Sequence, residues 1–308
     1  MSKIFLITGF LGSGKSTYIN RLLSDTNKKV GVLINEFGNI SVDTITLNKK
    51  GIDLIELTNG SIFCACLKDK FICGLMELLK IKLDEIYIEA SGLSDPSNIN
   101  SIIKILKKQL PDKVFELAGV ICLVDAVYFL KQINILESIR RQIEHSHFII
   151  INKIDLVDRE QIENTRRVIN EINPRAQIEC VSYGKSQRFM GDFSAFNISS
   201  DRTTNTVSSR PMSMTLEFIN PYSIDLIERF FASCKVDLYR AKGYVQVNEK
   251  TYKVDVVNKT IKVDLVKNVS NIKSEYINKI VLLFSKGNDS INSILKVINT
   301  DFSNLIKC

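Results

Sequence analysis

From residue 3 to about residue 182, short apolar runs alternate with longer stretches whose apolar side chains recur every three or four positions. The short runs predict buried strands, and the longer stretches predict amphipathic helices that pack on those strands. Alternation of this kind is typical of an α/β domain with a mostly parallel sheet and helices on both faces. We expect strands at residues 3–8, 30–35, 53–57, 85–89, 119–124, 148–152 and 177–181, and helices at residues 15–23, 68–80, 97–108, 126–141 and 159–171.

The pattern changes after residue 184. Residues 185–210 are polar, rich in Ser, Thr and Asn, and without periodicity, which is typical of a linker. After them, alternating runs predict antiparallel strands, and two amphipathic stretches predict helices. We therefore predict a first domain at residues 1–184, a polar linker at 185–210 and a smaller α+β domain at 211–308. The expected strands of the second domain are residues 212–218, several antiparallel strands joined by turns within residues 239–266, and residues 279–285. Its expected helices are residues 223–232 and 290–297.

A phosphate-binding motif directly follows the first predicted strand. The sequence GFLGSGKST fits the template G-x-x-x-x-G-K-[ST] and stands where a strand runs into a helix. Glycines lack a Cβ, so the backbone can turn its N–H groups toward phosphate oxygens, and the helix adds its positive amino-terminal end. Lys15 is expected to reach the β- and γ-phosphates, and Ser16 to bind Mg²⁺. The predicted phosphate-binding residues are Gly9, Gly12, Ser13, Gly14, Lys15, Ser16 and Thr17.

A second motif, Asn-Lys-Ile-Asp, ends the predicted strand at residues 148–152. The carboxylate of Asp155 can accept hydrogen bonds from guanine N1 and N2, which adenine does not offer. Together with the phosphate-binding motif, Asn152, Lys153 and Asp155 therefore predict a site for GTP rather than ATP. This selection of guanine also disfavours a small-molecule kinase.

Polar residues follow most of the predicted strands. In a parallel sheet the carboxyl ends of the strands share one edge, where ligands bind. Glu36 follows the second strand, Glu89 closes the fourth, and Ser182 follows the seventh. We therefore expect these loops to converge on one site, and we include Ser182 among the nucleotide-binding residues.

Composition excludes some classes of partner. The 308 residues carry 41 Lys and Arg against 34 Asp and Glu, for a formal net charge of +7, and the basic residues are scattered. We therefore expect no nucleic-acid partner. No apolar run approaches the ~18 residues of a membrane span, and no secretory signal is visible. We expect no membrane association and a cytoplasmic location, where the seven cysteines would remain thiols.

Several motifs can be considered together: GFLGSGKST at 9–17, NEFG at 35–38, EASGLSDP at 89–96, VDA at 124–126, NKIDL at 152–156, INPRA at 172–176 and RAKG at 240–243. In this order they closely resemble the motifs of the CobW-type P-loop GTPases, relatives of the UreG and HypB nickel-insertion GTPases. The resemblance implies a GTP-dependent metallochaperone that holds Zn²⁺ or Co²⁺ and delivers it to a client metalloenzyme or a cofactor-biosynthesis protein. It also implies a GTP-dependent homodimer.

The EASG segment has a physical interpretation of its own. The strand ends in Glu89, where a Mg²⁺-binding strand usually ends in Asp, and the longer side chain either reaches Mg²⁺ through a water or orients the attacking water. The N–H of Gly92 is expected to meet the γ-phosphate, so its loop would sense hydrolysis. Lys15, Glu89 and Gly92 are the predicted catalytic residues, and hydrolysis is expected to be slow. Asp43 is either a Mg²⁺ ligand in the GTP state or a solvated carboxylate.

The transition-metal site differs from the family pattern. A C-x-C-C cluster follows Asn-Gly in the family, but this chain has NGSIFCAC at residues 59–66. In an extended loop Cys64 and Cys66 point the same way, and two thiolates can then face one ion. Glu36 and Cys73 are the further candidate donors, since zinc takes four ligands, or three when one position stays open for exchange.

Two functions remain open at this point. The first is a metallochaperone that carries the ion on Cys64 and Cys66. The second is a nucleotide-gated docking switch, which activates a client metalloenzyme or corrinoid protein without carrying metal. In the second case these cysteines are small buried hydrophobes. The two histidines, His145 and His147, are expected to have a helix-end or partly buried role rather than to bind a metal.

Overall fold

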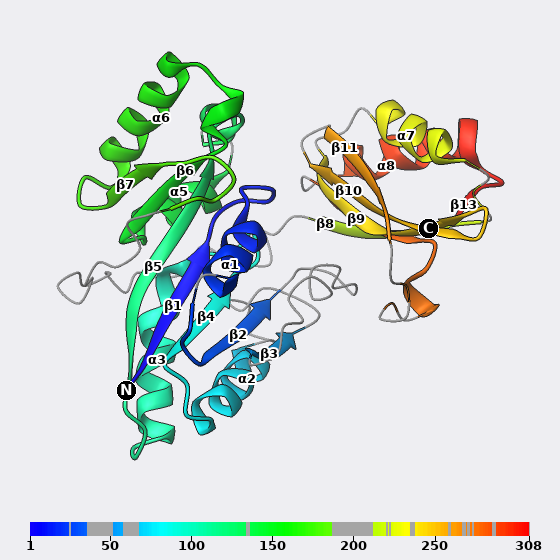
Figure 1. Ribbon diagram of the computed structural model, residues 1–308. Helices are drawn as coiled ribbons and strands as arrows, with labels where there is room; N and C mark the ends of the chain where they lie inside the picture. Colours follow the sequence, from blue (N-terminus) through cyan, green and yellow to red (C-terminus); the bar gives the residue numbers. More distant parts are fainter. Residues whose placement is uncertain are drawn as a thin grey trace. The chain divides into compact units, whose positions relative to one another are not determined.

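The structure is a computed structural model (Figure 1). It describes residues 1–24, 26–35, 52–57, 68–133, 136–186, 212–219, 221, 223–234, 238–257, 260–266, 269, 272, 274–284 and 288–307. The described residues up to 186 belong to one compact unit, and those from 212 belong to a second. We propose that the domain boundary falls within residues 185–210, most of which lie outside the described residues.

The first unit is built on a seven-stranded sheet with the order β3-β2-β4-β1-β5-β6-β7. Every described pairing within it is parallel. This result confirms the predicted mostly parallel sheet, and it brings the carboxyl ends of the strands to one edge. The strands are β1 (Ser2–Thr8), β2 (Val30–Asn35), β3 (Ile52–Leu57), β4 (Glu85–Glu89), β5 (Phe115–Asp125), β6 (Phe148–Asn152) and β7 (Gln177–Cys180).

Helices cover both faces of this sheet (Figure 1). Along β1, Ile4 and Leu6 pack with α2 and α3, whereas Phe5 and Ile7 pack with α1. Successive side chains of a strand point to opposite faces, so an almost continuously apolar strand places core residues on both. The helices are α1 (Lys15–Ser24), α2 (Lys68–Lys80), α3 (Ile99–Gln109), α4 (Phe129–Gln132), α5 (Glu137–Glu144) and α6 (Arg159–Ile172), with the short helices η2 (Pro96–Asn98) and η3 (Ile154–Leu156).

The single helix predicted at residues 126–141 is wrong. Two helices, α4 and α5, occupy this region, and Leu136 between them has an extended backbone with φ −118° and ψ 101°. The apolar spacing hides the break because Phe129 in α4, Ile133 directly after α4 and Ile139 in α5 are all buried. Hydrophobic periodicity reports burial, and here burial continues across the interruption.

The second unit is a six-stranded antiparallel sheet with the order β11-β10-β9-β12-β8-β13. Figure 1 shows α7 and α8 over the same face of this sheet, where Phe230 and Ile294 share one apolar core with Leu216 and Ala241. The predicted α+β fold is confirmed. The elements are β8 (Met212–Phe218), α7 (Ile224–Ser233), β9 (Leu238–Val247), β10 (Lys250–Val257), β11 (Thr260–Leu265), η4 (Ser274–Tyr276), β12 (Lys279–Phe284), α8 (Asn288–Val297), η5 (Ile298–Phe302) and β13 (Ile306–Lys307).

The sequence pattern did not predict three of these elements, η4, η5 and β13. A strand of two residues is too short to show alternation, and β13 exists because it pairs with the end of β8. Across the described residues, no helix combines the length and the apolar character that crossing a membrane requires.

Candidate functional site at the carboxyl edge of the parallel sheet

The loop that is predicted to bind phosphate connects β1 to α1, at the expected junction of a strand and a helix. Gly9 and Gly14 have φ angles of +132° and +103°, a region that side chains with a Cβ rarely adopt. A Cβ on Gly9 would lie 2.2 Å from the carbonyl oxygen of Leu123, and one on Gly14 would lie 2.4 Å from the Asn152 side-chain nitrogen. The loop is therefore packed against the ends of β5 and β6, and only glycine fits at these two positions.

Lys15 and Ser16 begin α1. The Lys15 ammonium donates to the carbonyl oxygens of Gly9 and Phe10, at 2.7 and 3.1 Å, and the side chain is buried. A buried ammonium that lies over a phosphate-type loop is suited to bind phosphate oxygens there. Ser13 is buried beside it, and Thr17 is exposed on α1. The roles of these residues toward a nucleotide stay predictions.

Ser16 contacts the predicted catalytic carboxylate. Its hydroxyl donates to Glu89 Oε1 at 2.9 Å, and the Glu89 side chain is buried at the end of β4. The two residues are 73 positions apart in the sequence, and the parallel pairing of β1 with β4 brings them together. Two oxygen donors side by side next to the phosphate loop form the kind of hard-ligand set that Mg²⁺ prefers.

Asn152 joins three predicted parts of the site. Its side-chain nitrogen donates to the carbonyl oxygen of Ser13 at 2.9 Å, and its side-chain oxygen accepts from the N–H of Gly184 at 3.0 Å. Because Asn152 is buried, both hydrogen bonds are shielded from water. The guanine motif, the phosphate loop and the loop after β7 that contains Ser182 are thus tied to one another.

The rest of the guanine motif lies in a fixed turn. Lys153 has a left-handed backbone with φ +65°, and its ammonium forms an ion pair with Asp125 Oδ2 at 2.6 Å. Asp125 also accepts a hydrogen bond from the N–H of Val127. Asp155, two residues further on in η3, is exposed. A carboxylate there is open to an incoming base, while the turn that carries it is held by the ion pair.

Gly92 lies directly against the phosphate loop. A Cβ on this residue would fall 2.6 to 2.8 Å from three atoms of Leu11, including the backbone nitrogen. The EASG loop therefore contacts the loop expected to hold the phosphates. Of the three predicted catalytic residues, Lys15 and Gly92 border the phosphate loop, and Glu89 is linked to it through Ser16.

Most of the predicted metal ligands lie outside the described residues: Glu36, Asp43, Cys64 and Cys66. Cys73 is described, and it is exposed on α2. The described part of the chain contains no group of three or more His, Cys, Asp or Glu side chains that could hold a metal ion. The transition-metal site therefore stays a prediction.

The two histidines serve the end of α5 and the start of β6. His145 is the C-cap residue of α5, and its side chain is buried. His147 Nδ1 accepts a hydrogen bond from the N–H of Val120 at 2.9 Å, so this nitrogen is engaged by the backbone. His145 thus lies at a helix end, and His147 is a buried residue that is bonded to the backbone of β5.

The buried cysteines are expected to be chemically inert. Burial raises the pKa of the thiols of Cys122 and Cys234 to about 12. At pH 8 only about 1 in 10⁴ of such thiols is a thiolate, the reactive form. We predict that N-ethylmaleimide labels the exposed Cys73 in the native protein and labels Cys122 and Cys234 only after unfolding, as read by peptide mass spectrometry. Labelling of Cys122 at the rate of Cys73 would contradict this burial.

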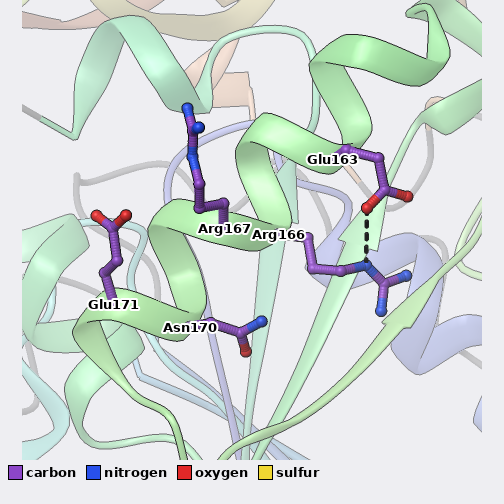
Figure 2. A pocket seen from close by; sticks show the side chains of 5 residues that line it. All are labelled: Glu163, Arg166, Arg167, Asn170 and Glu171. Carbon is purple, nitrogen blue, oxygen red and sulfur yellow. Dashed lines mark ion pairs between the residues drawn. The ribbon is translucent and has the colours of Figure 1, made fainter.

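A shallow pocket of about 390 Å³ lies along α6 (Figure 2). Figure 2 shows Arg166 and Glu163 facing each other, at 4.0 Å, while Arg167 and Glu171 point away from that pair. None of the predicted nucleotide-binding residues lines this pocket. Its lining is mixed in charge, which does not define a ligand.

Two contacts that shape the site were not predicted from the sequence. Asp125 holds Lys153, and Gln142 binds the loop that contains Gly92. Asp125 belongs to the VDA segment, so the position of that segment at a strand end was an available signal. Gln142 carries no local signal, because its partners lie about 50 positions away.

The fold and the site define a P-loop nucleotide-binding protein, in which a strand–glycine loop–helix unit meets an Asn-Lys-x-Asp turn at one sheet edge. A family profile, that of the CobW/HypB/UreG nucleotide-binding domain, matches residues 3–179. The chain belongs to this family, which confirms the resemblance drawn from its motifs.

Individual relatives share about a third of their residues with the chain over the aligned part. The chain is 33% identical over 187 residues to the zinc chaperone YjiA of Escherichia coli (strain K12), and this alignment covers 59% of this chain and 58% of YjiA. It is 32% identical over 203 residues to the zinc chaperone CobW of Sinorhizobium sp, and that alignment covers 55% of this chain and 56% of CobW. The matched part thus spans less than two thirds of either relative. The crystal structure of Zn(II)-bound YjiA GTPase from E. coli aligns with 96% of this chain and 98% of that one, at 22% identity and a TM-score of 0.48.

Proposed function

We propose that this protein is a GTP-binding and GTP-hydrolysing metallochaperone that delivers a transition metal ion, zinc or cobalt, to a client metalloprotein or cofactor pathway. The observation that carries the nucleotide-binding part of this proposal is the pair of hydrogen bonds made by Asn152. They link the guanine motif to the phosphate loop through Ser13 and to the loop after β7 through Gly184. One nucleotide can therefore contact all three segments.

The two ends of a nucleotide are assigned to different residues. Gly9, Gly12, Ser13, Gly14, Lys15, Ser16 and Thr17 are proposed to bind the phosphates, and Asn152, Lys153, Asp155 and Ser182 are proposed to surround the base. The Lys153–Asp125 ion pair supports the second assignment, because it fixes the turn that presents the Asp155 carboxylate. A fixed acceptor discriminates between bases more strongly than a mobile one.

The residues at the start of α1 and the end of β4 fit Mg²⁺. Ser16 Oγ and Glu89 Oε1 lie 2.9 Å apart, and both are oxygen donors of the type that Mg²⁺ binds directly or through water. Bound Mg²⁺ would neutralise charge on the β- and γ-phosphates. We propose that Ser16 contributes its hydroxyl, that Glu89 acts through a water or orients the attacking water, and that Asp43 completes the site in the GTP state.

Glu89 offers a direct test of this arrangement. Changing Glu89→Gln removes the negative charge and keeps the size, so GDP affinity should change little. Hydrolysis of saturating GTP should fall roughly 10- to 100-fold, the usual cost of losing a charged group that positions a water or a metal. The measurement is phosphate release at several Mg²⁺ concentrations. Glu85→Gln, at the other end of β4, is the matched control. Equal rates in both variants would contradict the assignment.

Intrinsic hydrolysis is expected to be slow. Unassisted GTPases with a P-loop run at about 10⁻⁴ to 10⁻² per second, and a slow rate suits a switch whose timing is set by a partner. The family to which the chain belongs supports hydrolysis of GTP, and so does its similarity to a protein named as a zinc-regulated GTPase metalloprotein activator, from Dictyostelium discoideum.

The cargo is proposed from chemistry and from relatives. The two relatives described above, YjiA and CobW, are named zinc chaperones. Cys64 and Cys66 are proposed as the thiolate ligands, with Glu36 and Cys73 as further donors, because thiolates select zinc and similar soft ions. A client metalloenzyme or cofactor-biosynthesis protein is the proposed recipient, and a GTP-dependent homodimer is the proposed assembly.

A cysteine variant separates this function from a docking switch that carries no metal. Equilibrium dialysis against zinc under reducing, anaerobic conditions should show one tightly bound ion for the natural protein and none for the double variant Cys64→Ala, Cys66→Ala. Cys180→Ala, which removes a thiol outside the proposed ligands, is the control. A double variant that still binds one zinc ion overturns the assignment of these cysteines.

A further inference from the structure

Gln142 is a fully buried glutamine on α5 that binds the loop containing Gly92. Its side-chain nitrogen donates to the carbonyl oxygens of Gly92 and Ser94, at 3.1 and 3.0 Å. Both hydrogen bonds join residues about 50 positions apart, and they lie out of contact with water. One side chain thus fixes two carbonyl groups of the loop after β4.

The same loop is held on its other sides. Gly92 packs against Leu11 of the phosphate loop so closely that a Cβ there would clash with its backbone nitrogen. At the far end of the loop, Arg141 lies 3.7 Å from the buried carboxylate of Asp95. Two adjacent residues of α5, Arg141 and Gln142, therefore hold this loop on one side. On its other side, the loop contacts the phosphate loop through Gly92.

The helix that carries Gln142 is itself anchored. At the end of α6, the Asn173 side-chain nitrogen donates to the carbonyl oxygens of Ile143 and Ser146, both at 2.8 Å. These bonds fix the last turn of α5 to a second helix. A glutamine on a fixed helix can hold a loop in one place, which is how a supporting residue preorganises a site.

We propose that Gln142 is a positioning residue of the nucleotide site, which holds the loop after β4 so that Gly92 stays beside the phosphate loop, ready for the γ-phosphate. This inference rests on the proposed GTPase function and deepens it. GDP lacks the γ-phosphate, so Gln142 should matter for GTP turnover and little for GDP binding. It touches no expected reacting atom and acts only through the loop.

Methionine at position 142 tests the proposal. Gln142→Met keeps the length and approximate volume of the side chain and removes the nitrogen donor. The oxygen Oε1 accepts no hydrogen bond from any described residue, so its loss removes no contact from that set. The chain also offers a matched control, Gln161 on α6. Its side-chain nitrogen donates to the carbonyl oxygens of Ala126 and Val127, at 2.7 and 3.2 Å, in the loop after β5.

The readout is steady-state GTP hydrolysis, with GDP affinity measured in parallel by a fluorescent analogue. For Gln142→Met we expect kcat to fall on the order of 10-fold or more, with GDP affinity within about 3-fold of the natural protein. Gln161→Met loses the same number of hydrogen bonds to a different loop, and its kcat should stay within about 3-fold of the natural value.

Unchanged kcat in Gln142→Met, or equal losses in both variants, overturns the proposal. A natural protein that binds GDP and GTP but turns over no GTP overturns the proposed hydrolysis, and this inference with it. If Gln142→Met does not fold, hydrogen exchange of the natural protein decides. Peptides of residues 91–95 and of α5 should gain protection together when a non-hydrolysable GTP analogue replaces GDP, and protection of the loop alone overturns the proposal.

Discussion

Replacing Lys15 with alanine is expected to lower the affinity for both GTP and GDP by at least about 100-fold. The ammonium is buried over the phosphate loop, where it now donates to two backbone carbonyl groups. With a nucleotide bound, the same donors would meet the β- and γ-phosphates. Two charge-assisted hydrogen bonds contribute about 1.5–3 kcal/mol each, and every 1.4 kcal/mol is a factor of ten in affinity.

The measurement is titration of the purified variant with fluorescent GDP and a GTP analogue. Lys28→Ala is the matched control, because it also removes a lysine with a hydrogen-bonded partner, Glu85, at the opposite edge of the sheet. The Lys15 variant leaves the carbonyls of Gly9 and Phe10 without this donor, so its melting temperature must be recorded alongside. A folded Lys15→Ala protein with the same affinity for both nucleotides as Lys28→Ala would contradict the assignment of the phosphate loop.

Replacing Asp155 with asparagine is expected to reverse the choice of base. Guanine presents N–H groups at N1 and N2 to the carboxylate, and an asparagine amide would turn a donor toward one of them. Where guanine carries its amino group, xanthine carries a carbonyl oxygen, which can accept a hydrogen bond from the asparagine side-chain nitrogen. We expect the preference for GTP over xanthosine triphosphate to shift by about 10⁴-fold, as for other sites built to hydrogen-bond a ligand.

Competition of GTP, xanthosine triphosphate and ATP against one fluorescent nucleotide measures this shift. Asp158→Asn is the matched control, since Asp158 caps α6 by accepting from the N–H of Gln161. Asparagine caps a helix about as well as aspartate, so this variant should keep the natural preference. If Asp155→Asn retains the natural preference for GTP, the motif does not read the base.

The sequence predicted the parts of the site that depend on local order. Gly9 to Thr17 combine a strand end, glycines and a helix start within nine adjacent positions, and the structure forms that strand, loop and helix there. The same holds for the strand that leads into Asn152. Their expected convergence at one edge follows from parallel pairing alone, because parallel strands must all end on the same side.

The contacts that join these parts were beyond sequence reasoning. Asn152 looked like a base-binding residue, yet in the structure its side chain also connects two loops. Lys153 and Asp125 lie 28 positions apart, and Gln142 lies about 50 from its partners. The spacing of these residues along the chain does not predict that they pair. Each contact arises from how helices and strand ends pack in three dimensions. The break between α4 and α5 was hidden for a related reason: apolar side chains continue on both sides.

If the protein is a GTP-driven metallochaperone, the bound nucleotide should change its affinity for the metal ion. Competition of zinc against a chromophoric chelator, performed anaerobically on the protein loaded with GDP or with a non-hydrolysable GTP analogue, tests it most directly. The account predicts one tight zinc site whose affinity differs at least about 10-fold between the two states, a coupling free energy of about 1.4 kcal/mol. Equal zinc affinity in both states, or no tight site in either, would contradict a GTP-driven metallochaperone.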